Sequence, residues 1–253
     1  MFSHYLALGD SMSIDLYPAL DAGETDVAVA LERDASAGRV APLGAASLLY
    51  RNDESHWPDE MGLDLASRFP HITHTNLAAD GATIGDVWEQ LASVEPSDEP
   101  TLVTLTVGAV DVLSTAANQP GKSLRAGIAR DLAQGYALLL DRILELRPAA
   151  HLLATTIYDP SDRTGKVPGA LREGDKLPLP LLDAFNAQLR ELAAARAEVT
   201  LADVYLRFLG HGVTAPVEDR WYWKRSLLEP NARGASEIRH AWIEALDDHA
   251  VRG

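Results

Sequence analysis

The chain alternates short apolar runs with longer stretches of helical period, and this alternation restricts the possible folds more than any other feature. Five runs rich in leucine and β-branched residues are predicted to be strands: His4–Leu8, Ile72–Asn76, Thr101–Val107, His151–Ile157 and Glu198–Val204. Strands that alternate with helices usually form a parallel sheet with helices on both faces. The sequence therefore predicts an α/β fold, a three-layer αβα sandwich around a doubly wound, five-stranded parallel sheet.

Helix signals lie between the predicted strands. One set of apolar residues repeats at the spacing of a single helix face: Ile84, Val87, Trp88 and Leu91. Just before this set, Thr83 and Asp86 have the spacing of an N-terminal capping box. A second helix is predicted over residues 123–147, where Pro148 ends it. A third is expected near the C-terminus, with Ser236 as its cap.

Residues 1–253 are expected to form a single domain, because 47% hydrophobic residues provide enough apolar surface for one large core. Two stretches, at about 14–56 and 159–180, show no sustained period and are predicted to be loop insertions over one edge of the sheet. Loops of this length in a compact domain often shape a substrate pocket. Solvated insertions without a role are the alternative interpretation.

The composition restricts the partners. A formal net charge of −15 disfavours binding to nucleic acid and to anionic membrane surfaces, so we expect neither as a partner. The chain has no cysteine, which excludes disulfides and cysteine-ligated metal sites. The first predicted strand begins at His4, with no basic and apolar leader segment before it, so a cytoplasmic protein is expected.

Polar residues follow the predicted strands, at the edge where ligands bind in open parallel sheets. Gly9-Asp10-Ser11 comes after the first strand and places a serine hydroxyl at a strand-to-helix turn. That is a suitable position for a nucleophile, although a helix cap is the more ordinary role of such a serine. The other three segments are 76–83 after the second strand, 108–111 after the third, and 229–234 before the last helix.

In this order, the four segments resemble the motif blocks of the GDSL-type esterases and lipases, the SGNH hydrolases. The resemblance spans nearly the whole chain and implies a flavodoxin-like sheet. It implies that Ser11 is the nucleophile and that the backbone N–H groups of Ser11 and Gly81 bind the developing oxyanion. Gly81 suits this role because a residue without Cβ allows close approach of the backbone. Asp10 and Asp111 are expected, with Gly81, to contribute to binding of the oxyanion or the substrate.

Two blocks depart from the family pattern. Where the family has Gly-x-Asn-Asp, this chain has Gly108-Ala109-Val110-Asp111, and valine cannot donate a hydrogen bond. The donor is then either missing or replaced by Asn76 or Asn118. Asp111 could order its loop through backbone N–H groups or simply cap a helix.

The other departure concerns the base. The family reads Asp-x-x-His-Pro-Asn, whereas this chain has Ser226 at the aspartate position and Glu229 at the histidine position. A glutamate acts as a base near neutral pH only if its pKa is raised by burial or by neighbouring carboxylates. The second candidate is His211, in the loop Gly210-His211-Gly212, with Asp203 to orient it. The sequence leaves both candidates open.

The resemblance implies a serine ester hydrolase that acts on a small ester or acyl group through an acyl-enzyme. The alternative is a non-catalytic, ligand-binding pseudoenzyme on the same fold, since the family's asparagine and histidine are both replaced. We expect no organic cofactor and no metal, and the oligomeric state stays open.

Overall fold

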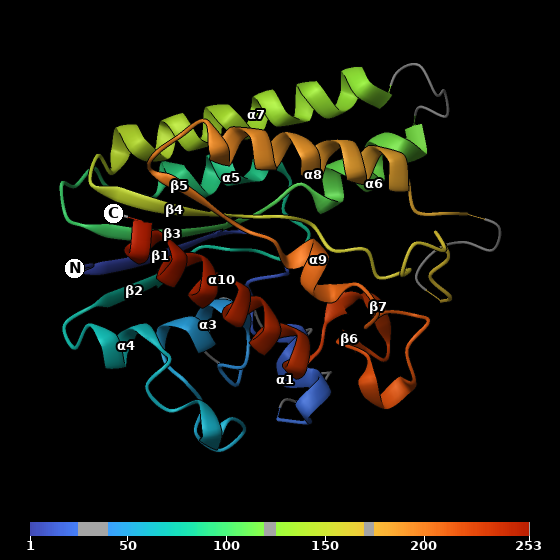
Figure 1. Ribbon diagram of the computed structural model, residues 1–253, viewed down its shortest axis with the longest axis horizontal. Coiled ribbons are helices and arrows are strands. Elements are labelled where there is room, and N and C mark those ends of the chain that lie inside the picture. The colour runs from blue at the N-terminus through green and yellow to red at the C-terminus, as the bar shows by residue number, and fades with distance from the viewer. Residues whose placement is uncertain (25–39, 119–124, 170–174, 253) are drawn as a thin grey trace.

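Five parallel strands form the centre of the computed structural model, which describes residues 1–24, 40–118, 125–169 and 175–252 (Figure 1). In chain order they are β1 (His4–Gly9), β2 (Thr73–Asn76), β3 (Thr101–Thr106), β4 (Ala150–Thr155) and β5 (Val199–Ala202). Their order across the sheet is β2-β1-β3-β4-β5, and all neighbours pair in parallel. This is the flavodoxin-like order of doubly wound sheets, and it confirms the predicted fold class.

Helices cover both faces of this sheet and complete three layers (Figure 1). One face is covered by α5 (Ile84–Ala92), α6 (Ala109–Asn118), α7 (Arg125–Leu146) and α8 (Leu179–Ala194). On the other side lie α1 (Leu16–Ala22), α3 (Ala45–Tyr50), α4 (Leu65–Arg68), α9 (Val204–Phe208) and α10 (Ala232–Arg252). Two short 3-10 helices, η2 (Pro58–Glu60) and η4 (Val217–Asp219), lie in loops.

Alternate residues of each strand supply the two cores. In β1, Leu6 and Leu8 pack under α5, α7 and α8, whereas Tyr5 and Ala7 pack under α3 and α10. Since successive side chains of a strand point to opposite faces, a strand covered on both sides is apolar along its whole length. This explains why the central strands β1, β3 and β4 appear in the sequence as mainly apolar runs, whereas the edge strand β2 is mostly polar.

The predicted helix after Gly81 is confirmed as α5, with Thr83 and Asp86 forming the expected capping box. The helix predicted over 123–147 is α7, which ends at Leu146, two residues before Pro148. The C-terminal helix begins at Ala232 rather than after Ser236. Ser236 is buried inside the helix and accepts a hydrogen bond from Arg239, so its prediction as a cap is wrong.

The stretch at 14–56 is not a simple loop, because α1 and α3 lie within it; residues 25–39 are outside the described part. These helices have seven and six residues, too few to show a sustained period in the sequence. In α3, the buried Leu48 and Leu49 belong to the same core as α10. The described part of 159–180 consists of turns and the start of α8, with positive φ at Asp162 (47°) and Arg163 (70°).

A short antiparallel hairpin was not predicted from the sequence. It joins β6 (Tyr222–Trp223) to β7 (Ser226–Pro230), just before α10. A two-residue strand is too short to show an alternating pattern. The hairpin matters because Glu229 is the next-to-last residue of β7.

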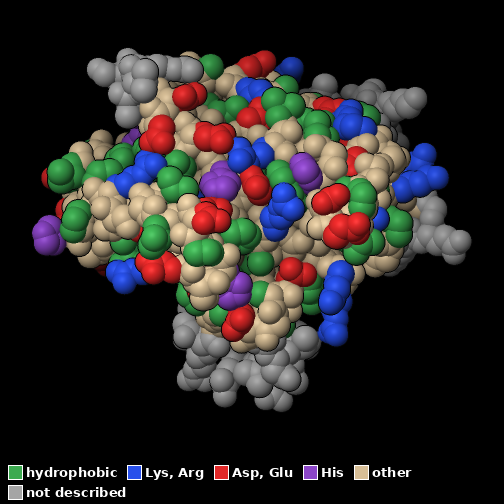
Figure 2. Space-filling view, turned by 60° about the horizontal axis from the view of Figure 1, so that its bottom comes forward, with side chains coloured by type: hydrophobic (Ala, Val, Ile, Leu, Met, Phe, Trp, Pro, Cys, Tyr) green, Lys and Arg blue, Asp and Glu red, His purple; other side chains and the backbone are tan. Residues whose placement is uncertain are grey.

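Two surface properties complete the description. Acidic and basic side chains are interspersed on the face shown in Figure 2, so the negative net charge does not form one continuous acidic patch there. None of the described helices combines the length and the apolar character needed to span a bilayer.

Candidate active site

The turn after β1 is fixed by backbone contacts. Gly9 has φ of +121°, and a Cβ added to it would lie 1.8 Å from the carbonyl oxygen of Thr106. Gln90 of α5 holds both backbone groups of Gly9: its Oε1 accepts from the N–H, and its Nε2 donates to the carbonyl, each at 2.8 Å. The N–H of Asp10 donates to the carbonyl of Thr106 at 2.7 Å. The position of Ser11 is therefore set by the sheet and by α5.

Asp10, the neighbour of Ser11, is buried at 1% exposure. Its Oδ1 accepts a hydrogen bond from the N–H of Met12 at 3.1 Å, whereas its Oδ2 has no partner. Burial is the main cause that raises the pKa of Asp10 to about 8, and the charge of Glu229 adds to this. A carboxyl with this pKa is mostly protonated at neutral pH.

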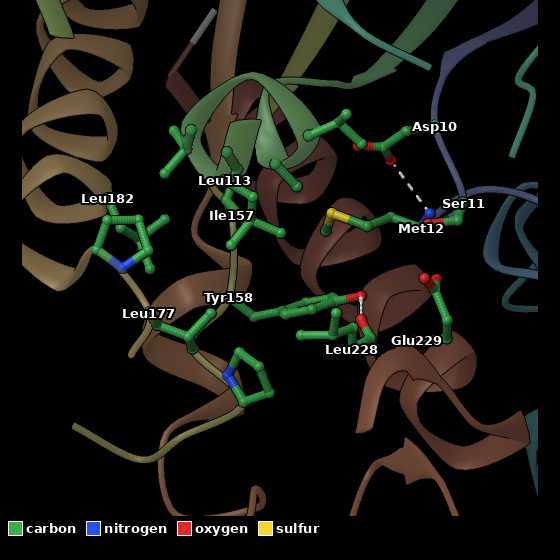
Figure 3. A pocket seen from close by; sticks show the side chains of 15 residues that line it. Asp10, Ser11, Met12, Leu113, Ile157, Tyr158, Leu177, Leu182, Leu228 and Glu229 are labelled. Carbon is green, nitrogen blue, oxygen red and sulfur yellow. Dashed lines mark hydrogen bonds between the residues drawn. The ribbon is translucent and has the colours of Figure 1, made fainter. Parts of the chain in front are cut away.

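Glu229 lies beside Ser11 and lines the same pocket (Figure 3). Burial raises the pKa of Glu229 to about 7, with the neighbouring Ser11 side chain lowering it and the charge of Asp80 raising it. One carboxylate oxygen, Oε2, is buried without a hydrogen-bond partner. Glu229 thus has a pKa close to neutral, which a glutamate base requires but which the sequence could not establish.

Asn231 fixes the segment that carries Glu229. Its side-chain Nδ2 donates to the carbonyl of Arg220 at 2.8 Å, and its Oδ1 accepts from the N–H of Gly234 at 2.8 Å. The backbone N–H of Asn231 donates to the carbonyl of Trp221 at 3.0 Å. These bonds attach the end of β7 to β6 and to the first turn of α10.

A pocket of about 180 Å³ extends from Ser11 and Glu229. Apart from those two residues, Asp10 and Tyr158, its lining is apolar: Met12, Ala109, Val110, Val112, Leu113, Ile157, Pro160, Leu177, Pro178, Leu182 and Leu228. The hydroxyl of Tyr158 donates to the carbonyl of Leu228 at 2.7 Å, so this ring is a fixed wall. Among the described residues, no group of three or more His, Asp and Glu side chains could hold a metal ion.

Gly81 and Asp111 lie near this site but do not line the pocket. Gly81 has φ of +69° and is exposed, with open space where a Cβ would lie. The carboxylate of Asp111 accepts from the N–H of Ile84 at 3.0 Å and so joins the start of α6 to the start of α5. Ile84 is the first residue of α5, so Asp111 contacts the start of a neighbouring helix, and its role in the site stays a prediction.

Neither Val110 nor Asn76 supplies the side-chain donor of the family's asparagine. Val110 lines the pocket at that position. Asn76 is occupied locally, since its Oδ1 accepts from the N–H of Ala78 at 3.0 Å. The side chain of Asn118 lies outside the described part of the chain.

His211 is not brought into the pocket. Its ring stacks on Trp221, with the centroids 3.7 Å apart and the planes 3° from parallel, and its Nδ1 lies 3.3 Å from the carbonyl oxygen of Asp219. Asp203 does not orient it, because that carboxylate accepts from Arg190, Thr156 and the N–H of Leu206. The structure therefore places Glu229, and not His211, beside the candidate nucleophile.

The glycines around His211 have a structural explanation. A Cβ at Gly212 would lie 2.3 Å from the carbonyl oxygen of Pro160. The carboxylate of Asp162 accepts the N–H groups of Gly210, Gly212 and Thr214. The loop is thus folded around Asp162, which accounts for its glycines without a catalytic role.

Two residues of the site were not anticipated from the sequence. Tyr158 lies just past the end of β4, at the edge where the other candidates were sought, and that position could have identified it. Tyr17, in α1, donates its hydroxyl to Oδ2 of Asp80 at 2.9 Å; burial raises its pKa, and the charge of Glu229 adds to this. Tyr17 lies in a stretch without sustained period, so no sequence signal pointed to it.

Comparison with known proteins identifies the family of the chain. The model of a family described as GDSL-like lipase/acylhydrolase matches residues 35–236, a range that includes Gly81, Asp111 and Glu229 but begins after Ser11. Among curated proteins, no sequence matches the chain.

Solved structures resemble the fold over nearly its whole length. An extracellular lipase from Streptomyces rimosus is 22% identical, with 98% of this chain and 99% of that chain covered and a TM-score of 0.54. A phospholipase A1 from Streptomyces albidoflavus is 19% identical, with coverage of 98% and 100% and a TM-score of 0.58. The acetylxylan esterase Axe2 from Geobacillus stearothermophilus is 15% identical, with coverage of 96% and 94% and a TM-score of 0.58. At these identities the likeness concerns the fold.

Proposed function

Because the chain belongs to the GDSL-like lipase/acylhydrolase family, we propose that it hydrolyses esters through a serine nucleophile, Ser11, with Glu229 as the base. The observation that carries this proposal is the position of Glu229. It lies in the pocket beside Ser11, and burial raises its pKa to about 7. General bases work best with a pKa near the operating pH.

The reaction has two halves. In the first, the hydroxyl oxygen of Ser11 attacks the ester carbonyl carbon while Glu229 takes the hydroxyl proton; the tetrahedral intermediate then collapses, the alcohol leaves with that proton, and an acyl-Ser11 remains. In the second, Glu229 takes a proton from water, the water oxygen attacks the acyl carbon, and Ser11 leaves with the proton. The carboxylic acid is released and the free enzyme returns.

The oxyanion formed in each half needs hydrogen-bond donors. Under this proposal the backbone N–H groups of Ser11 and Gly81 supply them, and Val110 contributes none. One such donor is typically worth about 10² to 10³ in rate. We therefore expect turnover to be slower than in enzymes that keep the asparagine.

Labelling with a fluorophosphonate tests the proposal directly. At about pH 8, where Glu229 is mostly ionised, the probe should attach to Ser11, as shown by mass analysis of the peptides, and a panel of p-nitrophenyl esters should be hydrolysed. Ser11→Ala should lose both. Ser55→Ala, which removes an exposed hydroxyl of the loop before η2, is the matched control and should keep both.

The alternative, a non-catalytic binding protein, is favoured by the replacement of two family residues, at Val110 and Glu229. It predicts that the folded protein is unlabelled and hydrolyses every ester no faster than Ser11→Ala. That result would overturn the hydrolase proposal.

A further inference from the structure

The pocket beside Ser11 has a polar end and an apolar end. In Figure 3, Ser11 and Glu229 lie on one side, and Leu113, Leu177 and Leu182 lie on the other. A substrate whose carbonyl carbon is at Ser11 must direct one of its two substituents toward these leucines. Under the proposed mechanism Glu229 returns the proton to the leaving alcohol, so the alcohol half faces Glu229 and the acyl chain is the half directed toward the leucines on the other side.

The apolar end offers no partner for a charged or strongly polar group. Among the described residues that line the pocket there is no Lys, Arg or His, and the two ionisable carboxyl groups, Asp10 and Glu229, lie at the polar end. A second carboxylate on the acyl group would lose its hydration without gaining a counter-charge, which is costly. The same applies, to a lesser degree, to hydroxyl groups.

The volume limits the size of the group. A cavity of about 150 Å³ lined by apolar side chains binds one benzene molecule. The pocket here, at about 180 Å³, is slightly larger, so it has room for about four to eight carbon atoms. An acetyl group would leave most of it unfilled, and each methylene buried should improve binding by about fourfold.

The far wall is part of the packed core and does not adjust freely. Leu182, on the inner face of α8, is 4% exposed, and its neighbour Leu181 is 1% exposed. Leu113 projects from α6, which packs against α8. Because packed interiors are dense, enlarging the pocket for a long chain would require a shift of these helices.

We infer that the natural substrates are esters of uncharged, apolar monocarboxylic acids of about four to eight carbon atoms, with the acyl chain bound against Leu113 and Leu182. This inference rests on the proposed function. It predicts that neither acetyl esters nor esters of long-chain fatty acids are preferred.

A series of p-nitrophenyl esters from acetate to palmitate tests the inference. The ratio kcat/KM should rise about fourfold per methylene up to a maximum between butyrate and octanoate, and fall at least tenfold by palmitate. The p-nitrophenyl monoester of glutarate, with its distal carboxylate, should react at least about tenfold more slowly than the ester of valerate, which has the same carbon count.

Two variants change the length of the apolar end of the pocket in opposite directions. Leu113→Trp should shift the maximum toward acetate, and Leu182→Ala should shift it toward longer chains. Leu138→Ala changes an exposed leucine of α7, 52% accessible, and should leave the profile unchanged. If all variants keep the parent profile while remaining folded by circular dichroism, the assignment of the pocket is overturned.

Binding of methyl ketones separates this inference from the proposed function, because a ketone cannot be hydrolysed. By calorimetry, 2-heptanone should bind more tightly than acetone, and Leu113→Trp should abolish the difference. If Ser11 is unreactive but this pattern holds, the hydrolase proposal fails and the pocket assignment stands. If Ser11-dependent hydrolysis is found with acetate or palmitate as the best ester, the hydrolase stands and the inference is overturned.

Discussion

Two segments from opposite ends of the chain meet at the pocket, and they are built differently. The turn Gly9–Ser11 keeps the residues of the family pattern and is held by the sheet and by Gln90. The segment 226–231 keeps Pro230 and Asn231 but has Ser226 and Glu229 where the family has aspartate and histidine. In the second segment, the residue that fixes the backbone is retained and the residue beside Ser11 is changed.

The difference teaches that the geometry and the chemistry of this site depend on different residues. The hydrogen bonds that Asn231 makes with Arg220, Gly234 and Trp221 do not involve the side chain at position 229. In the turn Gly9–Ser11, by contrast, the residues that fix the backbone cannot be separated from those at the reacting hydroxyl. The three-residue turn that positions Ser11 also contains the buried Asp10. Substitutions in the two segments should therefore have different consequences.

The largest effect is expected from Glu229→Gln. If Glu229 is the base, the rate of ester hydrolysis should fall by about 10³-fold, because a positioned base contributes about 10² to 10⁴. The amide keeps the shape of the side chain and cannot accept the proton. Steady-state kinetics with the best p-nitrophenyl ester measures the change, and a loss of less than tenfold would exclude Glu229 as the base.

The double substitution Ser226→Asp with Glu229→His is the companion experiment. It restores the family's residues on the retained backbone and should recover at least about tenfold over Glu229→Gln. Failure to recover, in a protein that folds, would show that the backbone alone does not determine the position of the base.

Gly9→Ala should be the most damaging substitution for stability in the first segment. A Cβ there would lie 1.8 Å from a backbone oxygen of β3, at φ of +121°. Overpacking and backbone strain together should lower the free energy of unfolding by about 4 kcal/mol. Gly62→Ala is the control: it also has positive φ, +83°, but open space at the Cβ, and should cost about 1 kcal/mol. Urea denaturation measures both, and equal losses would contradict the steric explanation.

Asn231→Ala tests the second segment. Loss of its side-chain hydrogen bonds should lower the free energy of unfolding by about 2 kcal/mol, since each is worth about 1 kcal/mol. Because this segment carries Glu229, its loosening should displace the base. The factor by which kcat falls should then be larger than the factor by which KM changes. If the free energy of unfolding falls as expected but kcat is unaltered, other contacts position Glu229.

The pH dependence of stability compares the carboxyl groups of the two segments. The pKa of Glu229 is raised to about 7 and that of Asp10 to about 8, so both groups bind a proton more tightly in the folded chain than in the unfolded one. Their stabilising effect is complete below about pH 4 and is lost as the pH rises through these values. The free energy of unfolding should therefore decrease between about pH 5 and pH 8.

Glu229→Gln should reduce that decrease by about 2 kcal/mol, so that at about pH 8 the variant is more stable than the parent protein. Urea titrations at the two pH values provide the measurement. If the free energy of unfolding depends on pH in the same way in both proteins, the pKa of Glu229 is not raised in the folded chain.

The smallest effect is expected from His211→Asn. Since the ring stacks on Trp221 outside the pocket, kcat/KM should change less than about twofold. A loss of tenfold or more in the folded variant would restore His211 as a candidate base and weaken the assignment to Glu229.

All five strands were located to within two residues at either end. The three central strands β1, β3 and β4 are buried along their whole length, which gives them a strong apolar signal, whereas the edge strand β2 is mostly polar and only partly buried. The helices α1 and α3 and the hairpin β6–β7 were missed because they are too short for a periodic signal. Ser236 was assigned as a cap because nothing local showed that its helix begins at Ala232.

The candidate site was predictable only where it depends on the ends of strands. Ser11 was identified because it follows β1. The choice between Glu229 and His211 was not possible from the sequence, since it depends on the stacking of Trp221 and on the raised pKa of a buried carboxyl, both products of tertiary packing. The leucines of the pocket come from α6, α8, the segment before α8 and β7, and no local pattern distinguishes them from other core leucines.

The double hydrogen bond between Gln90 and Gly9 has a mechanical consequence. Gln90 lies near the end of α5, and α5 begins three residues after Gly81, so one rigid helix of nine residues spans the two turns that contain Ser11 and Gly81. The helix therefore links the two turns, and the N–H of Ala79 links them directly by donating to the carbonyl of Gly9 at 3.0 Å. We expect these two connections to keep the distance between the N–H groups of Ser11 and Gly81 constant.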